Sequence, residues 1–199
     1  MAFETLEIAY DDRVLRPRPW TAQQSRWAAE LVATAPPGPV LELCAGAGQI
    51  GLHTISLRPR PLVCVDLSPV ACDYARRNAE AAGLGALVDV REGPMDAVLQ
   101  PDERFAVVVA DPPWVPSGET GRYPEDPLGA IDGGPDGLDA ARACLRVAAE
   151  HLLPGGDVVL QVGTRAQVDT LEADGSGSRA GLAVAEVRDG ERGVLVRLR

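Results

Sequence analysis

Short, valine-rich apolar runs alternate along the chain with stretches of helical periodicity, and this alternation restricts the fold more than any other feature. Short, mainly apolar runs of this kind are candidates for parallel strands that are buried on both faces. They lie at Val40–Leu43, Leu62–Val65, Leu87–Val90, Phe105–Ala110 and Val158–Val162. Helical stretches lie before and between them, at Trp20–Ala33, Gln49–Leu57, Pro69–Ala82 and Leu138–Leu153. The alternation predicts an α/β fold, a doubly wound and mostly parallel sheet with helices on both faces.

The end of the chain departs from this rhythm. Leu182–Val187 and Val194–Leu198 have the character of strands, and a short turn containing Asp189–Gly190 joins them. That pattern is typical of an antiparallel hairpin. Five parallel strands and this hairpin predict a seven-stranded, Rossmann-like sheet with one antiparallel strand. The Gly/Ser-rich stretch Asp174–Ser178 is expected to be a flexible loop.

Size and composition predict one soluble domain without a membrane segment. The chain has 199 residues, of which 46% are hydrophobic and 24% charged, and its longest apolar runs are far below the length of a membrane span. Its first twenty residues lack the pattern of a signal peptide, so we expect a cytoplasmic protein. The four cysteines and two histidines have no recognisable zinc spacing, so no metal site is predicted and reduced thiols are expected.

The formal net charge of −10 argues against nucleic acid as the partner, because a protein that neutralises phosphates needs clustered Lys and Arg. Arg13, Arg16 and Arg18 form the only early basic cluster. A solvated face explains this cluster somewhat better than a contact with phosphate or with an acidic substrate.

A small-residue loop joins the first predicted strand to the next helix and resembles a nucleotide-type pocket. Gly46 and Gly48 permit backbone angles and close approaches that a Cβ would block, and free amides at a helix start favour a polar ligand. Their neighbours Cys44, Ala45 and Gln49 complete the expected cofactor loop. The spacing Gly46-x-Gly48-x-x-Gly51 also fits a dinucleotide fingerprint, so the loop alone leaves the cofactor open.

Two acidic residues at strand ends narrow the choice of cofactor. Glu42 can accept hydrogen bonds from a cationic ammonium group, as in S-adenosylmethionine (SAM), whereas a carboxylate would repel the pyrophosphate of NAD. Asp66 ends the second strand, where an acidic side chain can bind both ribose hydroxyls of either cofactor. Leu67, which follows Asp66, is expected to contact the cofactor as well.

The tetrapeptide Asp111-Pro112-Pro113-Trp114 follows the fourth predicted strand directly. This placement puts it in the ligand crevice that open α/β sheets form at the carboxyl ends of their strands. The two prolines favour extended geometry, so that the Asp111 carboxylate and the Pro112 carbonyl can hold an NH₂ group and turn its lone pair toward a methyl donor. Trp114 can stack on a planar substrate or attract a sulfonium through its π face. Asp111 is therefore expected to contact cofactor and substrate, and Pro113 the substrate.

Taken together, these residues resemble the class I SAM-dependent methyltransferases, and among them the HemK/PrmC-like group, which methylates a glutamine side-chain amide in peptide release factors. Val14–Thr21 looks like the PRPxTE segment of that group, and the resemblance implies that Arg18, Trp20 and Thr21 contact the substrate. Leu128–Asp139 looks like its GGxDGLD segment. The resemblance runs from about Val14 to Val162 and implies SAM as the cofactor.

The chain differs from that group at several of these positions. The group usually has NPPY where this chain has Asp111 and Trp114, a form more familiar in adenine-N6 methyltransferases. Cys44 stands where the group usually has glycine. Pro94 stands where an acidic residue usually contacts adenine, so adenine recognition is expected from backbone groups near Pro94 and Met95. Only 39 residues precede Val40, the start of the strand that leads into the glycine loop.

The leading hypothesis is a SAM-dependent N-methyltransferase that acts on a planar nitrogen of a small molecule, a peptide or a protein glutamine. Residues 1–38 are expected to form a helical segment on the substrate side, and residues 39–199 the SAM-binding domain. An adenine-N6 methyltransferase, an NAD-dependent oxidoreductase and a SAM-binding protein without turnover stay open as alternatives. The sequence leaves the acceptor and the oligomeric state undetermined.

Overall fold

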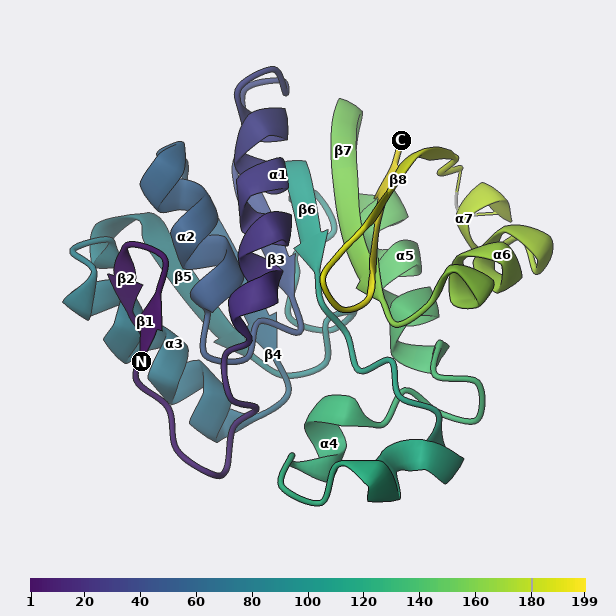
Figure 1. Ribbon diagram of the computed structural model, residues 1–199. Coiled ribbons are helices and arrows are strands. Elements are labelled where there is room, and N and C mark those ends of the chain that lie inside the picture. Colours follow the sequence, from purple (N-terminus) through teal and green to yellow (C-terminus); the bar gives the residue numbers. More distant parts are fainter. Residues whose placement is uncertain (180) are drawn as a thin grey trace.

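The computed structural model describes residues 1–179 and 181–199 of the chain. A seven-stranded sheet runs through the centre of the molecule, with strand order β5-β4-β3-β6-β7-β9-β8 (Figure 1). Neighbouring strands from β5 to β7 are parallel, and β9 is antiparallel to both of its neighbours. The strands are β3 (Val40–Leu43), β4 (Leu62–Asp66), β5 (Val88–Glu92), β6 (Phe105–Ala110), β7 (Leu152–Val162), β8 (Val184–Asp189) and β9 (Val194–Leu198). This topology confirms the predicted doubly wound fold with a terminal hairpin.

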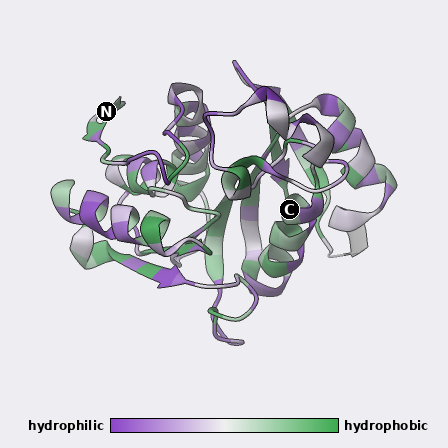
Figure 2. Cartoon of the chain, turned by 90° about the horizontal axis from the view of Figure 1, so that it is seen from below, coloured by the Kyte–Doolittle hydropathy of each residue, from purple (hydrophilic) through white to green (hydrophobic). Residues whose placement is uncertain are grey.

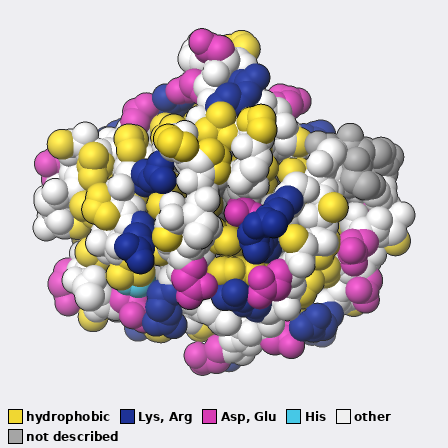
Figure 3. Space-filling model, turned by 90° about the horizontal axis from the view of Figure 1, so that it is seen from above, with side chains coloured by type: hydrophobic (Ala, Val, Ile, Leu, Met, Phe, Trp, Pro, Cys, Tyr) yellow, Lys and Arg dark blue, Asp and Glu magenta, His cyan; other side chains and the backbone are white. Residues whose placement is uncertain are grey.

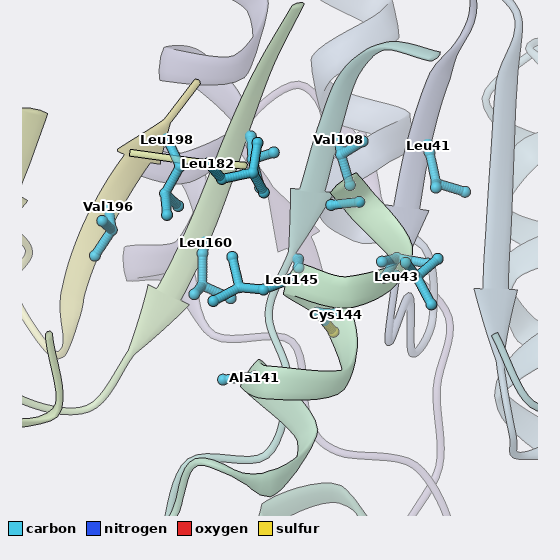
Figure 4. Packing of buried hydrophobic residues seen from close by; sticks show 14 of the residues in the cluster. Leu41, Leu43, Val108, Ala141, Cys144, Leu145, Leu160, Leu182, Val196 and Leu198 are labelled. Atoms are coloured by element: carbon cyan, nitrogen blue, oxygen red, sulfur yellow. The ribbon is translucent and has the colours of Figure 1, made fainter. Parts of the chain in front are cut away.

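Helices cover both faces of the sheet (Figure 1). Side chains of α1 (Ala22–Val32), α2 (Gln49–Leu57) and α3 (Pro69–Ala81) join one buried cluster with alternate residues of the strands. Side chains of α5 (Asp139–His151) and α6 (Arg165–Ala173) join a second cluster with the intervening strand residues. Figure 4 shows part of the second cluster, including Leu43, Cys144 and Leu160. Two apolar layers therefore hold the central strands rigidly between them.

Several helix ends differ from the sequence expectation. The first helix begins with a 3₁₀ turn, η1 (Pro19–Thr21), because proline at the first position suits a helix start. The helix predicted to continue to Leu153 ends at His151, since Leu152 already pairs with Phe105 as the first residue of β7. The stretch expected to be a flexible loop contains the short helix α7 (Ser176–Arg179) instead. The loop prediction was wrong, because Asp174 accepts a hydrogen bond from the Ser176 N–H and starts a turn.

Smaller elements were not predicted. The chain starts with a hairpin of β1 (Ala2–Phe3) and β2 (Leu6–Glu7), whose Phe3 is buried in the first cluster. A further 3₁₀ turn, η2 (Gly85–Leu87), precedes β5. The long connection after β6 contains η3 (Ser117–Arg122) and α4 (Leu128–Ile131). These pieces are too short to show a periodicity in the sequence.

Candidate functional site

The carboxyl ends of β3, β4 and β6 lie at the same edge of the sheet, which Figure 2 shows from below. Leu43 at the end of β3 is opposite Val65 on β4 and Ala110 on β6. The loops that follow these three strands therefore start side by side. The chain leaves β3 toward β4 on one side, while β6 lies on the other side. This is the switch point at which open α/β sheets form their ligand crevice.

The loop after β3 has three residues in the left-handed region of backbone conformation. The φ angles are +56° at Cys44, +54° at Gly46 and +80° at Gly48. A residue with a Cβ rarely adopts such an angle, which explains why glycine is usual at the position that Cys44 occupies. No atom lies within 4 Å of the place that a Cβ on Gly46 would take, so the loop is open there. Ala45, in contrast, is 3% exposed.

Glu42 lies on β3 beneath this loop and is 2% exposed. Its Oε1 atom accepts a hydrogen bond of 2.9 Å from the Gly51 N–H, and its Oε2 atom accepts one of 3.2 Å from the Cys64 thiol. Burial raises the pKa of Glu42 to about 7, and the negative charges of Asp111 and Asp66 act in the same direction. In this structure the carboxylate thus joins β3, α2 and β4 and supports the glycine loop from below.

Asp66 ends β4 and holds the glycine loop from the side. Its Oδ2 atom accepts from the Gly46 N–H and its Oδ1 atom from the Ser68 N–H, each at 2.8 Å. Burial raises its pKa. The next side chain, Leu67, is 68% exposed at the same edge of the sheet. A large apolar side chain that protrudes beside a charged pocket offers a contact surface for a flat, apolar ring.

The loop after β5 lies next to Asp66, because the Gly93 N–H donates to the Asp66 carbonyl at 2.9 Å. Pro94 is exposed and Met95 is half-buried against the second core cluster. The Pro94 carbonyl accepts from the Ala97 and Val98 amides. Of the backbone groups that the sequence assigned to adenine recognition, the Pro94 carbonyl is therefore already used within its own turn.

Asp111 immediately follows β6 and lies on the other side of the switch point. Its carboxylate makes no hydrogen bond to any residue that the structure describes, and burial raises its pKa to about 7. The charge of Asp111 acts on Glu42, so the two carboxylates from neighbouring strands lie in one site. An unpartnered carboxyl group in a partly buried crevice is available to a ligand that donates N–H groups.

The structure brings the tetrapeptide together with the segment that resembles GGxDGLD. The Val115 N–H donates to the Ile131 carbonyl and the Gly133 N–H donates to the Val115 carbonyl. Gly133 and Gly137 leave no room for side chains, because a Cβ at either position would overlap backbone atoms of Pro113 or Trp114. Pro112 is buried, whereas Pro113 and Trp114 are half-buried. The two motifs thus form one folded wall of the crevice.

The N-terminal segment is joined to the loop that carries these motifs. Arg18 donates to Asp126 Oδ1 at 2.6 Å, and this ion pair connects the segment to the loop after β6. Trp20 is half-buried between two guanidinium groups, with Arg18 at 5.6 Å and Arg192 at 5.4 Å from its ring centre. Thr21 is 2% exposed and its hydroxyl donates to the Arg18 carbonyl. In this structure the Thr21 hydroxyl thus stabilises the turn of its own segment.

Three buried amide side chains that the sequence did not single out hold these pieces in place. Asn78 donates to the carbonyls of Ala9 and Ala47, and so connects the N-terminal segment to the glycine loop. Gln24 donates to the Ala110 carbonyl at 2.9 Å, one residue before Asp111. Gln167 contacts Trp114. Only the Thr-x-x-Gln capping pattern around Gln167 could have been found in the sequence.

The charges of the crevice fit a cationic ligand. Glu42, Asp66 and Asp111 lie together, and no Lys or Arg of the described residues forms an ion pair with any of them. Gln49 adds a buried Oε1 atom without a hydrogen-bond partner, at the start of α2. A ligand with positive charge and N–H donors would satisfy both features, whereas a pyrophosphate would be repelled. The described residues hold no group of three or more His, Cys, Asp or Glu side chains that could bind a metal ion.

Comparison with known protein families finds a match for the central part of the chain. The family model described as a methyltransferase domain matches residues 40–118. That range begins with β3 and includes the glycine loop, Asp66 and the tetrapeptide. Among the described residues, no helix has the length and apolar character that crossing a membrane requires.

Curated relatives carry more specific names. The release factor glutamine methyltransferase of Gloeobacter violaceus is 35% identical over 163 residues, which are 79% of this chain and 57% of the relative. The ribosomal protein uL3 glutamine methyltransferase of Bradyrhizobium diazoefficiens is 37% identical over 129 residues, 62% of this chain and 40% of the relative. The chain thus spans less than two thirds of the length of these relatives.

A solved structure supports the fold. The catalytic domain of hMettl16, in a complex with an RNA hairpin, has a TM-score of 0.74 at 15% identity, over 97% of this chain and 74% of that one. At this level of identity the likeness concerns the fold alone. Taken together, residues 40–118 match a methyltransferase domain, the fold is the Rossmann-like fold of methyltransferases, and the chain is similar to glutamine methyltransferases over most of its own length.

Proposed function

We propose that this chain transfers a methyl group from SAM to a planar nitrogen atom of a peptide, a protein glutamine side chain or a small molecule. The observation that carries this proposal is the Asp111 carboxylate. It follows β6 at the switch point of the sheet, it is partly buried, and it has no hydrogen-bond partner among the described residues. A group in that position is suited to present an acceptor nitrogen to a cofactor held by the glycine loop.

The family uses SAM, and the crevice suits it. When bound, SAM supplies an electrophilic methyl group on a positively charged sulfur. Gly46 and Gly48 would let the cofactor approach the backbone, and Leu67 would cover its flat ring. The carboxylates of Glu42 and Asp66 would offset its positive charge, directly or through the loop that both of them hold.

Asp111 and Pro112 present the acceptor in this proposal. A carboxylate oxygen of Asp111 and the Pro112 carbonyl would accept hydrogen bonds from the two N–H groups of an NH₂ group, so that its lone pair faces the methyl group. The new N–C bond would replace the bond between the methyl carbon and the sulfur, which would leave as a neutral thioether. The proton of the methylated nitrogen then leaves to Asp111 or to water. Because burial raises the pKa of Asp111 to about 7, the group can take up a proton near neutral pH. Trp114 and residues 1–38 form the substrate side.

The relatives favour an amide acceptor. Their names specify glutamine methylation in a release factor and in ribosomal protein uL3, and an amide nitrogen meets the geometric demands of Asp111. Two alternatives fit less well. The net charge of −10 would repel a nucleic-acid acceptor. Three carboxylates would repel the diphosphate of NAD.

A mass-spectrometric screen tests the proposal. The full chain is incubated with SAM and with separate sets of glutamine-containing peptides, small amides and amines, and adenine oligonucleotides. We expect a glutamine-containing peptide to gain the mass that corresponds to replacing one hydrogen atom by a methyl group. If no acceptor in any set gains mass while calorimetry shows SAM binding, the proposal fails and the chain is a SAM-binding protein without turnover.

Substitutions at Asp111 separate presentation of the acceptor from binding of the cofactor. Asp111→Ala should lower turnover by about 10² or more and leave SAM affinity largely intact, because positioning contacts are commonly worth that much. Asp111→Asn keeps an acceptor oxygen, so an amide should still be methylated. Wild-type turnover of Asp111→Ala on the identified acceptor would show that Asp111 is only a loop residue.

A further inference from the structure

The side chain of Gln167 makes contacts with three separate segments around the crevice. We propose that Gln167 is a positioning residue for the acceptor site, which it keeps in place by binding Trp114 and the segment 136–137 to the end of β7. This inference rests on the proposed function, since it concerns the wall against which the acceptor nitrogen is placed. Gln167 is the third residue of α6 and is 8% exposed.

The oxygen of this amide binds the turn after β7. Oε1 accepts from the Gly163 N–H at 2.8 Å and from the Thr164 N–H at 3.1 Å. The bond to Thr164 is half of a capping box, in which the Thr164 hydroxyl in turn accepts from the Gln167 N–H. Capping explains these contacts fully, and a glutamate would provide them equally well.

The nitrogen of the amide has no part in the cap. Nε2 donates to the Trp114 carbonyl at 2.9 Å, to the Asp136 carbonyl at 3.1 Å and, more weakly, to the Gly137 carbonyl at 3.4 Å. These carbonyls belong to the two motifs that form the wall of the crevice. Buried carbonyls require a hydrogen-bond donor, while the Gly163 and Thr164 N–H groups require an acceptor. Only a side chain that is donor and acceptor at once, such as an amide, serves both. The hydrogen bonds to the three carbonyls therefore explain why this residue is glutamine and not glutamate, whereas the capping of α6 does not.

The ring of Trp114 lies on the same turn. A Cβ on Gly163 would overlap the Cε3 and Cζ3 atoms of the ring, and a Cβ on Gly137 would overlap the Trp114 carbonyl. The ring is therefore held from one side by the Gly163 backbone, while Gln167 holds its carbonyl. Trp114 is three residues after Asp111, so a shift of this wall also moves the group that presents the nitrogen. Misplacement by about 1 Å can cost about a hundredfold in rate.

The test uses Gln167→Glu, which keeps the two accepted bonds of the cap and removes the donor to the three carbonyls. We expect the KM for the glutamine-containing peptide that wild type methylates to rise about tenfold or more, with the Kd of SAM within about twofold of wild type. The emission and acrylamide quenching of Trp114 should change too, and this change should be absent when Gln167→Glu is made in a Trp114→Phe background. Thr164→Ala is the matched control, because it removes the hydroxyl of the cap and leaves the donor in place.

Each result of these measurements either supports or overturns the role of Gln167. Unchanged KM and unchanged Trp114 emission in Gln167→Glu would overturn the inference. The inference would also be overturned if KM and Trp114 emission changed equally in Thr164→Ala and Gln167→Glu and in proportion to the loss in Tm. A purely structural role of Gln167 predicts that result. If wild type methylates none of the acceptors, the proposed function fails, while the Trp114 signal still shows whether Gln167 holds the wall.

Discussion

Three carboxylates give the crevice its electrostatic character at the scale of single residues. Glu42, Asp66 and Asp111 come from the ends of three neighbouring strands, and burial raises the pKa of each. An acid whose pKa is higher in the folded state holds its proton over a pH range in which the unfolded chain has already lost it. The stability that this group contributes is present below its ordinary pKa and is lost as pH rises through the folded pKa.

This linkage predicts how Glu42 affects stability. Its pKa rises from 4.5 to about 7, so the free energy of unfolding should fall between those values, by about 3 kcal/mol at most for this group. Glu42→Gln keeps an acceptor for the Gly51 N–H and removes the titration, so it should flatten the pH dependence. Urea denaturation at several pH values measures it, with the exposed Glu172→Gln as control. A Glu42→Gln profile as steep as that of wild type would contradict the assignment.

Cys44 occupies a backbone conformation that glycine usually occupies. Its φ of +56° is an angle that glycine adopts without strain. The side chain is half-buried, packs against the second core cluster, and its sulfur lies 3.9 Å from that of Cys144 on α5. Packing of the thiol under the cofactor loop thus accompanies the strained backbone that the loop requires.

At the scale of elements, α3 connects the N-terminal segment to the glycine loop. Asn78 is 1% exposed, accepts from the Ala9 N–H at 2.8 Å and donates to the Ala9 and Ala47 carbonyls. On the same helix, the Tyr74 hydroxyl donates to Asp11 at 2.9 Å. A segment without long periodic structure of its own is therefore positioned by side chains of a helix.

Removal of this connection should affect both stability and the cofactor loop. Asn78→Ala removes the hydrogen bonds to the Ala9 N–H and to the Ala9 carbonyl, and it leaves the buried Ala47 carbonyl without this partner. The free energy of unfolding should fall by about 1 to 3 kcal/mol. It should also weaken SAM binding, because Ala47 is part of the loop. Asp73→Ala, which removes an exposed ion pair with Arg76 on the same helix, should change stability by less than about 0.5 kcal/mol. Equal effects of the two substitutions, in denaturation and in calorimetric titration, would refute this role of Asn78.

At the scale of the whole molecule, acidic residues are in excess but are spread out. The chain has 29 Asp and Glu against 19 Lys and Arg. On the face opposite to the crevice, acidic and basic side chains are intermingled (Figure 3). Several arginines are engaged by carboxylates, including Arg91 with Glu103 and Arg142 with Asp136. Such pairs reduce the positive charge that is available to phosphates.

The charge balance predicts weak binding to nucleic acid. The protein should pass through a DNA or RNA column at physiological salt, because a non-specific complex needs several free cations along one surface. Binding measured against salt concentration provides the finer check. Micromolar affinity with a steep salt dependence would reverse this conclusion and restore the adenine-N6 alternative.

The sequence by itself determined the order and type of most of the main elements and the position of the chemistry, although the helix α6 was not predicted. The short apolar runs from Val40 onward form strands, most of them buried on both faces, whereas β5 lies at the edge of the sheet and is only half-buried. The glycine loop and the tetrapeptide follow the carboxyl ends of β3 and β6, and Asp66 ends β4. Local pattern was sufficient there, because backbone direction and side-chain period are local properties. It was insufficient for η3, α4 and α7, which are too short for a period.

Only the tertiary structure decided which side chains face the crevice and which support it. Glu42 binds Gly51 and Cys64 below the glycine loop, and the Thr21 hydroxyl donates to the Arg18 carbonyl, and neither set of contacts was predicted from the sequence. Gln167 reaches Trp114, which is 53 residues away in sequence. The physical reason is that a hydrogen bond between distant segments depends on strand order and helix packing, which no spacing of residues encodes.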